Sequence, residues 1–405
     1  MTNQEKKVPE LRFPEFDEEW EEKTIGKIAT TFSGGTPSST NRSYYNGEIP
    51  FIRSGEISKS STELMINKEA ISNSSAKMVE KGDLLYALYG ATSGEVAISK
   101  INGAINQAVL CIRSQESATY IFNYLKMKKD QILKTYIQGG QGNLSASIIK
   151  KVDINLPYIE EQEKIGTFFS KLDRQIELEE QKLAKLEEQK KGYMQKLFSQ
   201  ELRFKDENGD DYPEWMETNI RNTFDNKGGT ALEKEFDNNG THKVISIGSY
   251  SMNSTYNEQN LRINKNEFTE KYLLNEGDLA MVLNDKTKEG NIIGRSIYID
   301  EDDKYIYNQR TERLIPVTGN NHKFLWYLMN SEQFRKKIKQ MMQGATQVYI
   351  NYNSIKDLSI YLPILEEQNK ISNFFTKFDE RIENQNQKID GLKKRKKGFL
   401  QKMFV

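Results

Sequence analysis

Few residues of this chain have the types and spacing that catalysis requires. The segments "EEK" (21–23) and "DDK" (302–304) have the D/E-x-K form of a nuclease site, but no Pro-Asp pair precedes either of them. Two histidines and one cysteine cannot build a zinc site unaided. Cys111 lies in an apolar stretch and His322 at an expected helix start. We therefore expect a core thiol and a surface imidazole.

Motifs for nucleotides and cofactors are absent as well. No G-x-G-x-x-G follows an apolar stretch, and no G-x-x-x-x-G-K-[ST] loop is present. The chain has no adjacent prolines, so it lacks the Asn-Pro-Pro-aromatic motif that holds a flipped adenine. The sequence therefore predicts a chain that is not an enzyme and that binds no cofactor and no metal.

The segments that position the remaining polar residues occur twice in the sequence. Residues 154–198 and 360–404 align without a gap and share 23 identities in 45 positions, at a constant offset of 206. Other landmarks recur in the same order, among them "ELRF" (10–13, 201–204), "GGT" (34–36, 228–230) and "NQ" (106–107, 308–309). Repeats of this kind indicate a tandem duplication with constant ends and a divergent insert in each half.

Each insert has the pattern of one α+β domain. Short apolar stretches bounded by Gly, Asn or Pro predict strands, and a helical stretch follows them in both halves. We expect two pseudo-symmetric globular α/β domains separated by a pair of long helices that form an antiparallel coiled coil. The expected bounds are 1–157 for the N-terminal segment and first domain, 158–199 for a central helix, 200–363 for the second domain and 364–405 for a C-terminal helix.

The repeated segment has the heptad pattern of a coiled coil. Its apolar positions are spaced alternately by four and three residues, and both copies are interrupted at the same two places. Such a seam needs a partner, so we expect the two helices to pair in a register that sets Glu179 against Lys396 and Lys190 against Gln385. Separate coiled coils with outside partners are the alternative. The expected pairing residues are Ile176, Glu179, Leu183, Leu186, Lys190, Ile382, Gln385, Ile389, Leu392 and Lys396.

Composition limits the class of protein. The chain has 58 basic and 58 acidic residues, so no net charge points to nucleic acid or membrane. With 20 tyrosines and 19 phenylalanines it is too aromatic for a disordered chain. One cysteine excludes a disulfide framework, and no apolar run approaches the roughly 20 residues of a membrane span. We expect a soluble, cytoplasmic protein.

Four stretches of the first half carry a family resemblance. They read "SGGTPSSTNRSYYNGEIPFIRSGEI" (33–57), "KGDLLYALYGATSGEVAI" (81–98), "INQAVL" (105–110) and "LPYIEEQEKIGTFFSKLD" (156–173). The "LP…EEQ.KI..FF.K.D" signature also follows the second insert, and it is the most specific part. Together they resemble the specificity subunit of type I restriction–modification enzymes, over essentially the whole chain.

The resemblance implies a function and a set of partners. In that family two variable target-recognition domains each read one half of a bipartite, asymmetric DNA site, and two conserved helices act as spacer and docking surface. Separate modification subunits methylate the DNA, and separate restriction subunits cleave it. The resemblance therefore implies double-stranded DNA, two modification subunits and two restriction subunits as partners. S-adenosylmethionine, ATP and Mg are expected on those subunits, and no membrane is involved.

Base-reading residues vary with the target in that family, so we select polar loop residues instead. Glycine lets a backbone approach a phosphate, and amides or hydroxyls can read base edges. The candidates in the first domain are Ser33, Gly34, Gly35, Thr36, Arg42, Tyr44, Thr92, Gln138, Gln141 and Asn143. The candidates in the second domain are Lys227, Gly228, Gly229, Thr230, Asn284, Lys286, Thr287, Arg310, Thr346 and Gln347.

Two alternatives stay open at this point. Ordinary surface loops have the same composition as these candidates. A non-enzymatic scaffold, whose two domains bind proteins and whose coiled coil acts as a spacer, would have the same repeat. The second half also departs from the family pattern, because it has "NDKTKEGN" (284–291) where the first has "YGATSGE" (89–95).

Overall fold

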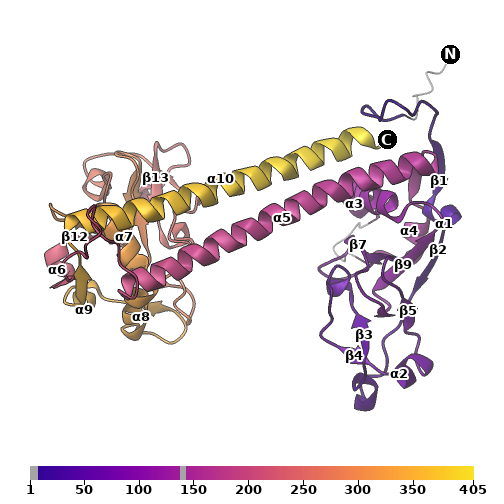
Figure 1. Cartoon of the computed structure of the whole chain (residues 1–405), viewed down its shortest axis with the longest axis horizontal. Helices are drawn as coiled ribbons and strands as arrows, with labels where there is room; N and C mark the ends of the chain where they lie inside the picture. Colours follow the sequence, from indigo (N-terminus) through magenta and orange to yellow (C-terminus); the bar gives the residue numbers. More distant parts are fainter. Residues whose placement is uncertain (1–7, 137–142) are drawn as a thin grey trace. The chain divides into compact units, whose positions relative to one another are not determined.

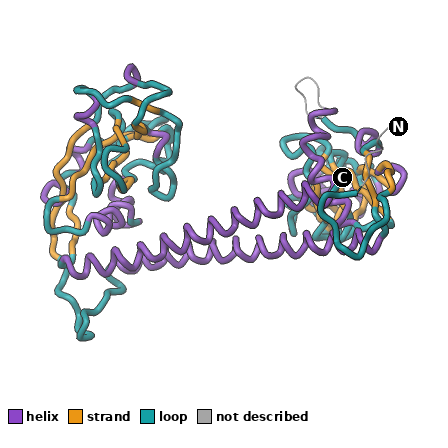
Figure 2. The backbone as a smooth tube through the Cα atoms, turned by 90° about the horizontal axis from the view of Figure 1, so that it is seen from above, coloured by secondary structure: helices purple, strands orange, loops and turns teal. Residues whose placement is uncertain are grey.

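A computed structural model describes residues 8–136 and 143–405 and divides the chain into two compact units. The first unit comprises Met1–Gln181 and Asn386–Val405, and the second comprises Lys182–Gln385. Each unit combines an α/β domain with parts of two long helices, α5 (Ile159–Phe198) and α10 (Leu365–Met403) (Figure 1). Both domains contain strands, helices and long loops (Figure 2). The predicted fold class, with two repeated α/β domains and a pair of long helices, is confirmed.

The domain of the first unit contains two four-stranded sheets. Its main sheet has the order β2-β9-β6-β7 and is antiparallel throughout. Its second sheet has the order β4-β3-β8-β5, in which β3 and β8 are parallel. The strands are β1 (Glu21–Thr24), β2 (Ala29–Ser33), β3 (Ile49–Ile52), β4 (Met65–Ile66), β5 (Lys77–Val79), β6 (Leu84–Ala87), β7 (Val96–Ile98), β8 (Gly103–Ile105), β9 (Val109–Ser114) and β10 (Asp153–Leu156). The helices are α1 (Ile25–Ile28), α2 (Lys68–Ser72), α3 (Ala118–Tyr136) and α4 (Ala146–Lys150).

Strand β6 explains how the sequence places this main sheet between two layers. Successive side chains of a strand point to opposite faces. Leu84 and Tyr86 pack in the core that contains α3 and the start of α5, whereas Leu85 and Ala87 pack against the second sheet. All four side chains are buried. A strand buried on both faces needs apolar residues at every position, as "LLYA" supplies.

The second unit repeats this topology. Its main sheet has the order β12-β19-β15-β17, and its second sheet has the order β14-β13-β18 with β13 and β18 parallel. A short pair, β16 and β20, is added after β15. The strands are β11 (Met216–Asn219), β12 (Phe224–Gly228), β13 (His242–Ile245), β14 (Arg262–Ile263), β15 (Leu279–Val282), β16 (Asn284–Asp285), β17 (Ser296–Tyr298), β18 (Tyr305–Tyr307), β19 (Thr311–Pro316), β20 (Val348–Tyr349) and β21 (Ser359–Leu362). The helices are α6 (Ile220–Thr223), α7 (His322–Asn330), α8 (Glu332–Gln340) and α9 (Tyr352–Ile355).

The end of each long helix completes the core of one unit. In the first unit, the buried ring of Phe404 stacks on Phe169 with centroids 5.8 Å apart. In the second unit, Phe198 stacks on Phe375 with centroids 6.2 Å apart. Phe404 lies 206 residues after Phe198, and Phe375 lies 206 residues after Phe169, so the repeat preserves this contact.

The two "ELRF" segments bind these helix ends in the same way. The Leu11 N–H donates to the Lys402 carbonyl at 2.8 Å, and Arg12 forms an ion pair with the buried Glu161 at 2.7 Å. In the second unit, Arg203 pairs with the buried Glu367 at 2.6 Å. Each "ELRF" segment therefore binds the long helices in its own unit.

Helices α5 and α10 run antiparallel within each unit, but the predicted register is wrong. In the first unit Lys396 pairs with Asp173, and Lys388 pairs with Glu179 at 2.9 Å. In the second unit Lys190 pairs with Asp379 at 2.5 Å. Lys190 thus faces a carboxylate rather than Gln385, and Lys396 faces Asp173 rather than Glu179.

The physical reason is the cost of an unpaired charge in a seam. The predicted register offers one carboxylate, that of Glu179, to two lysines, and it leaves Lys190 against an amide. The observed register gives each lysine an aspartate that lies beside the seam, which reduces the desolvation cost. Lys396 is 7% exposed, and burial lowers its pKa while Asp173 opposes the shift.

Candidate nucleic-acid interface

Loops from four parts of the first domain meet at one edge of its main sheet. Strands β2 and β6 end at this edge and β9 begins there, because β9 runs antiparallel to both. The Gly34 N–H donates to the Asn106 carbonyl at 3.2 Å, and the Leu144 N–H donates to the Leu88 carbonyl at 2.9 Å. We call the segments 33–36, 89–94, 106–108 and 143–145 the first rim.

The second domain builds the same edge from the equivalent loops. Strands β12 and β15 end there and β19 begins there. The Leu283 N–H donates to the Arg310 carbonyl at 2.9 Å, and the Ile350 N–H donates to the Leu283 carbonyl at 2.9 Å. We call the segments 228–231, 283–294, 308–310 and 343–351 the second rim. Both domains therefore present loops on the same frame.

The structure brings most of the candidate residues together on these rims. Those on the first rim are Ser33, Gly34, Gly35, Thr36, Thr92 and Asn143. Those on the second rim are Gly228, Gly229, Thr230, Asn284, Lys286, Thr287, Arg310, Thr346 and Gln347. Lys227 precedes this rim in β12, and its Nζ donates to the Lys271 carbonyl at 2.6 Å. Gln138 and Gln141 lie outside the described residues. A DNA-binding role for these residues stays a prediction.

Two candidates lie away from the first rim. Arg42 and Tyr44 belong to a 3₁₀ turn, η1 (Arg42–Tyr45), that precedes the second sheet. Tyr44 is half-buried in the cluster around Phe51, and its hydroxyl accepts a hydrogen bond from Asn73 Nδ2 at 3.2 Å. Arg42 is exposed. This pair thus lies outside the four rim segments, although the hydroxyl of the neighbouring Tyr45 donates to the Pro37 carbonyl beside the rim at 2.7 Å.

The rim glycines are explained by packing of the chain on itself. A Cβ on Gly34 would lie 1.8 Å from the Ile105 carbonyl oxygen, and one on Gly229 would lie 2.0 Å from that of Asn308. Gly34 and Gly229 are therefore structural equivalents, whereas the "GGT" motifs align Gly34 with Gly228. The strand register agrees, since Ser33 pairs with Leu110 and Gly228 with Glu312.

Gln107 and Gln309 are rim residues that the polar-loop selection omits. The Thr36 hydroxyl donates to Gln107 Oε1 at 2.6 Å, and Gln309 Nε2 donates to Glu233 Oε1 at 2.8 Å. In both domains the preceding asparagine accepts a backbone N–H from two residues ahead at 3.1 Å. The repeated "NQ" was the available signal, because it marks the same turn in both halves.

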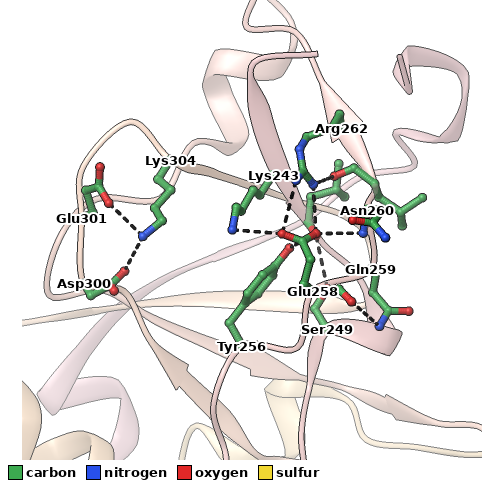
Figure 3. Close-up of polar contacts among 12 residues, drawn as sticks. Lys243, Ser249, Tyr256, Glu258, Gln259, Asn260, Arg262, Asp300, Glu301 and Lys304 are labelled. Carbon is green, nitrogen blue, oxygen red and sulfur yellow. Dashed lines mark hydrogen bonds and ion pairs between the residues drawn. The ribbon is translucent and has the colours of Figure 1, made fainter. Parts of the chain in front are cut away.

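Basic residues differ in how fully the protein itself neutralises them. In Figure 3 the Glu258 carboxylate lies between Lys243 and Arg262, and Lys304 lies between Asp300 and Glu301. This cluster surrounds the start of β13, at the end opposite the second rim. On the rim, Arg310 and Lys286 form no ion pair with any residue in the described ranges. Two cations of the second domain that form no ion pair within the described ranges thus lie at the loop edge, although the charge of Arg310 acts on the carboxylate of Glu233.

Glu258 gives the cluster of Figure 3 a pH dependence. Hydrogen bonds from Arg262 above all, and from Lys243, lower the pKa of Glu258 from 4.5 to about 2. Because this pKa is lower in the folded protein, the ionised carboxylate stabilises the fold above pH 4.5 and the contribution is lost as the pH falls towards 2.

We expect Glu258→Gln to lower the stability of the second unit by about 1 kcal/mol or less at pH 6, since the pair is partly exposed. The difference from the parent protein should narrow as the pH falls from 5 to 3. Urea unfolding at a series of pH values measures it, with Glu301→Gln as a control on a more exposed carboxylate. A difference that stays constant from pH 6 to pH 3 would contradict the assignment.

The residues considered for catalysis have structural environments. Cys111 is fully buried in β9, and burial raises the pKa of its thiol to about 12, so the predicted core thiol is confirmed. His322 begins α7 and is half-buried. Within residues 8–136 and 143–405, no group of three or more His, Cys, Asp or Glu is placed to hold a metal ion. In the same ranges, no helix has both the length and the apolar character of a membrane span.

Comparison with known proteins agrees with this architecture. The family model described as "Type I restriction modification DNA specificity domain" matches residues 17–188 and 212–394, one match for each half of the chain. The MjaVIII type I restriction enzyme specificity subunit of Methanocaldococcus jannaschii is 28% identical over 415 residues, which cover 98% of this chain and 93% of that protein. The EcoR124I/EcoR124II specificity subunit of Escherichia coli is 28% identical over 175 residues, 40% of this chain and 43% of that protein.

A solved structure shows the same fold. The S subunit of a type I restriction–modification system from M. genitalium superposes with a TM-score of 0.60 at 14% identity, covering 98% of this chain and 99% of that chain. The duplicated domains, the paired long helices and the two family matches converge. The chain belongs to the type I restriction–modification DNA specificity family, as a specificity subunit with two recognition domains.

Proposed function

We propose that each recognition domain reads one half of a bipartite, asymmetric DNA site through its rim. The observation that supports this is that equivalent strand ends in the two domains carry loops with different side chains. Both rims are built on equivalent strand ends, yet "YGATSG" (89–94) on the first corresponds to the longer "NDKTKEGNIIG" (284–294) on the second. Equal frames with unequal side chains suit two unlike half-sites that are approached in the same way.

We further propose that the chain works within a larger complex. The long helices act as spacer and as docking surface for two modification subunits, because the helix sequence occurs in two copies. Two restriction subunits complete the assembly. S-adenosylmethionine then binds the modification subunits, and ATP and Mg bind the restriction subunits. A non-catalytic role for this chain agrees with the specificity-subunit names of its relatives. The alternative of a protein-binding scaffold is not favoured by the family match.

The test is to express the chain with its modification subunit and to sequence the methylome of the host. We expect methylation at a single bipartite motif with an unspecified gap and unlike halves. Calorimetry on the chain alone should detect no S-adenosylmethionine binding at micromolar affinity. Exchange of residues 89–94 for another polar loop should change one half of the motif only. Methylation without a defined motif, or a change in both halves, would count against the proposal.

Truncation after Phe198 gives a further prediction about the helices. The fragment keeps the first domain and α5, and a second copy of α5 can supply Lys190 in place of Lys396 as the partner of Asp173. The Phe198 of the second copy can likewise replace Phe404. We therefore expect a symmetric dimer which, with modification subunits, methylates a palindrome of one half-site.

Analytical ultracentrifugation of the fragment measures this outcome. Asp173→Lys should weaken the dimer, because two lysines then face each other, and the double change Asp173→Lys with Lys190→Asp should restore it. A fragment that remains monomeric at tens of micromolar would contradict pairing through this seam.

A further inference from the structure

The second rim contains a loop whose backbone is held from beneath by cations. Arg335 of α8 is 8% exposed, and it donates from Nη1 to the Ile293 carbonyl at 2.8 Å and from Nη2 to the Asn291 carbonyl at 2.9 Å. Lys339 Nζ, one turn further along α8, donates to the Glu289 carbonyl at 3.3 Å. Three carbonyl groups of the loop 285–294 therefore point towards the protein.

A second guanidinium adds to the positive charge below this loop. Arg295 donates from Nε to the Asn291 carbonyl at 3.2 Å and from Nη1 to the Ser254 hydroxyl at 3.0 Å. Burial lowers the pKa of Arg295, and burial together with the charge of Arg295 lowers that of Arg335 to about 10. The buried carboxylate of Asp285 acts on Arg335, and its oxygens accept hydrogen bonds from the loop's own Thr287 and Ile292 amides.

The outer side of the loop carries donors and further positive charge. Lys286 and Lys288 are exposed. Among the described residues the ion-pair partner of Lys288 is Glu289, at 4.0 Å, and both side chains are more than half exposed. In the turn Thr287–Gly290, the amides of Lys288 and Glu289 donate to no acceptor within the described part of the chain. The turn thus combines two exposed ammonium groups with two amides that have no acceptor in the described part of the chain, an arrangement that favours an anion.

The first rim has no counterpart of this cationic loop. Its segment 89–94 reads "YGATSG" and contains no charged residue. The Ser93 hydroxyl of that segment donates to the Leu88 carbonyl at 3.0 Å, and Gly94 packs on Leu133 of α3. The cationic loop is therefore a property of the second domain rather than of the common frame.

We propose that the turn 286–290 binds a phosphate of the DNA backbone beside the half-site of the second domain. The inference rests on the proposed function, since it identifies the ligand as DNA. Lysines at the surface and two guanidiniums beneath it act on one anion, and the free amides add directional donors. Such contacts fix the position of a protein on DNA without reading its sequence. They also release counterions, so they appear in the salt dependence of binding.

The experiment compares two complete methyltransferase complexes. One contains the parent chain, and the other contains a chain that carries both Lys286→Gln and Lys288→Gln. Each lost phosphate contact reduces the slope of log affinity against log salt by about 0.9. Because the turn is proposed to bind one phosphate, we expect a reduction of about 0.9, so that the affinity advantage of the parent over the variant shrinks about 3.5-fold between 50 and 200 mM salt. The methylated motif should stay unchanged, because both lysines are proposed to contact phosphate only.

The matched control combines Lys81→Gln and Lys100→Gln, two exposed lysines at the end of the first domain's main sheet opposite its rim. This control should leave the slope unaltered. An unchanged slope in the loop variant would overturn the inference. The proposed function would still hold in that case if the parent complex methylates a defined motif. If no motif is found, the proposed function fails, yet the slope on nonspecific DNA still decides whether the loop binds phosphate.

Discussion

Replacing Phe404 by alanine should destabilise the first unit by about 3–5 kcal/mol, the usual cost of removing a buried phenylalanine ring. The ring is 5% exposed, and it contacts Tyr120, Tyr124 and Phe169 with centroid distances of 5.1, 5.9 and 5.8 Å. These three residues come from α3 and from the start of α5. The ring thus completes a core most of whose members lie more than two hundred positions earlier in the sequence.

The repeat supplies a reciprocal variant. Phe198→Ala removes the equivalent ring from the second unit, where it contacts Trp215, Phe324 and Phe375. Hydrogen exchange read by peptide should show faster exchange in the first unit for Phe404→Ala and in the second unit for Phe198→Ala. Tyr158→Ala, at a side chain that is 64% exposed, is the control and should change little. If Phe404→Ala accelerated hydrogen exchange equally in both units, the ring would not act on the first unit alone.

The sequence predicted the long helices well because their signal is local and periodic. The same two interruptions of the seam, at Glu179 and Lys190 and again at Gln385 and Lys396, marked the repeat. The register of the two helices could not be predicted from this local pattern. It depends on Asp173 and its repeat equivalent, which lie beside the seam and reach the lysines only when both helices are placed in space. Matching seam positions alone could not include them.

For the rims, too, local sequence features could be predicted, whereas contacts between distant segments could not. Polar loops were visible as composition, and most of the selected residues do lie at the two sheet edges. The sequence did not show that Gly34 corresponds to Gly229, because that equivalence follows from strand pairing with β9 and β19. Nor did it show the loop over Arg335, because the guanidinium comes from a helix more than forty residues after the loop begins.

Inserting one heptad into each long helix should widen the unspecified gap of the DNA site by one to three base pairs and leave both half-sites unchanged. Seven residues keep the seam in phase and add about 10.5 Å of helix. At about 3.4 Å per base pair this corresponds to roughly three base pairs if the whole length becomes separation along the DNA. An oblique path of the helices and the twist of the duplex reduce the expected value.

The observed ion pairs decide where the heptads belong. Asp173–Lys396 and Lys190–Asp379 enclose equal lengths of α5 and α10, so the two insertions must face each other at the middle of those lengths. The matching points are after Gln181 and after Gln387, because 173–181 and 388–396 are then equally long, as are 182–190 and 379–387. Leucine at the two seam positions of each inserted heptad continues the apolar contact.

Methylome sequencing of cells that express the lengthened chain with its modification subunits measures the gap. A heptad inserted into α5 alone is the control, since it slips one helix past the other by two turns and separates Asp173 from Lys396 or Lys190 from Asp379. We expect that control to lose methylation, whereas the double insertion keeps it at a wider site. An active double insertion with an unaltered gap would show that the length of the paired helices does not set the spacing of the half-sites.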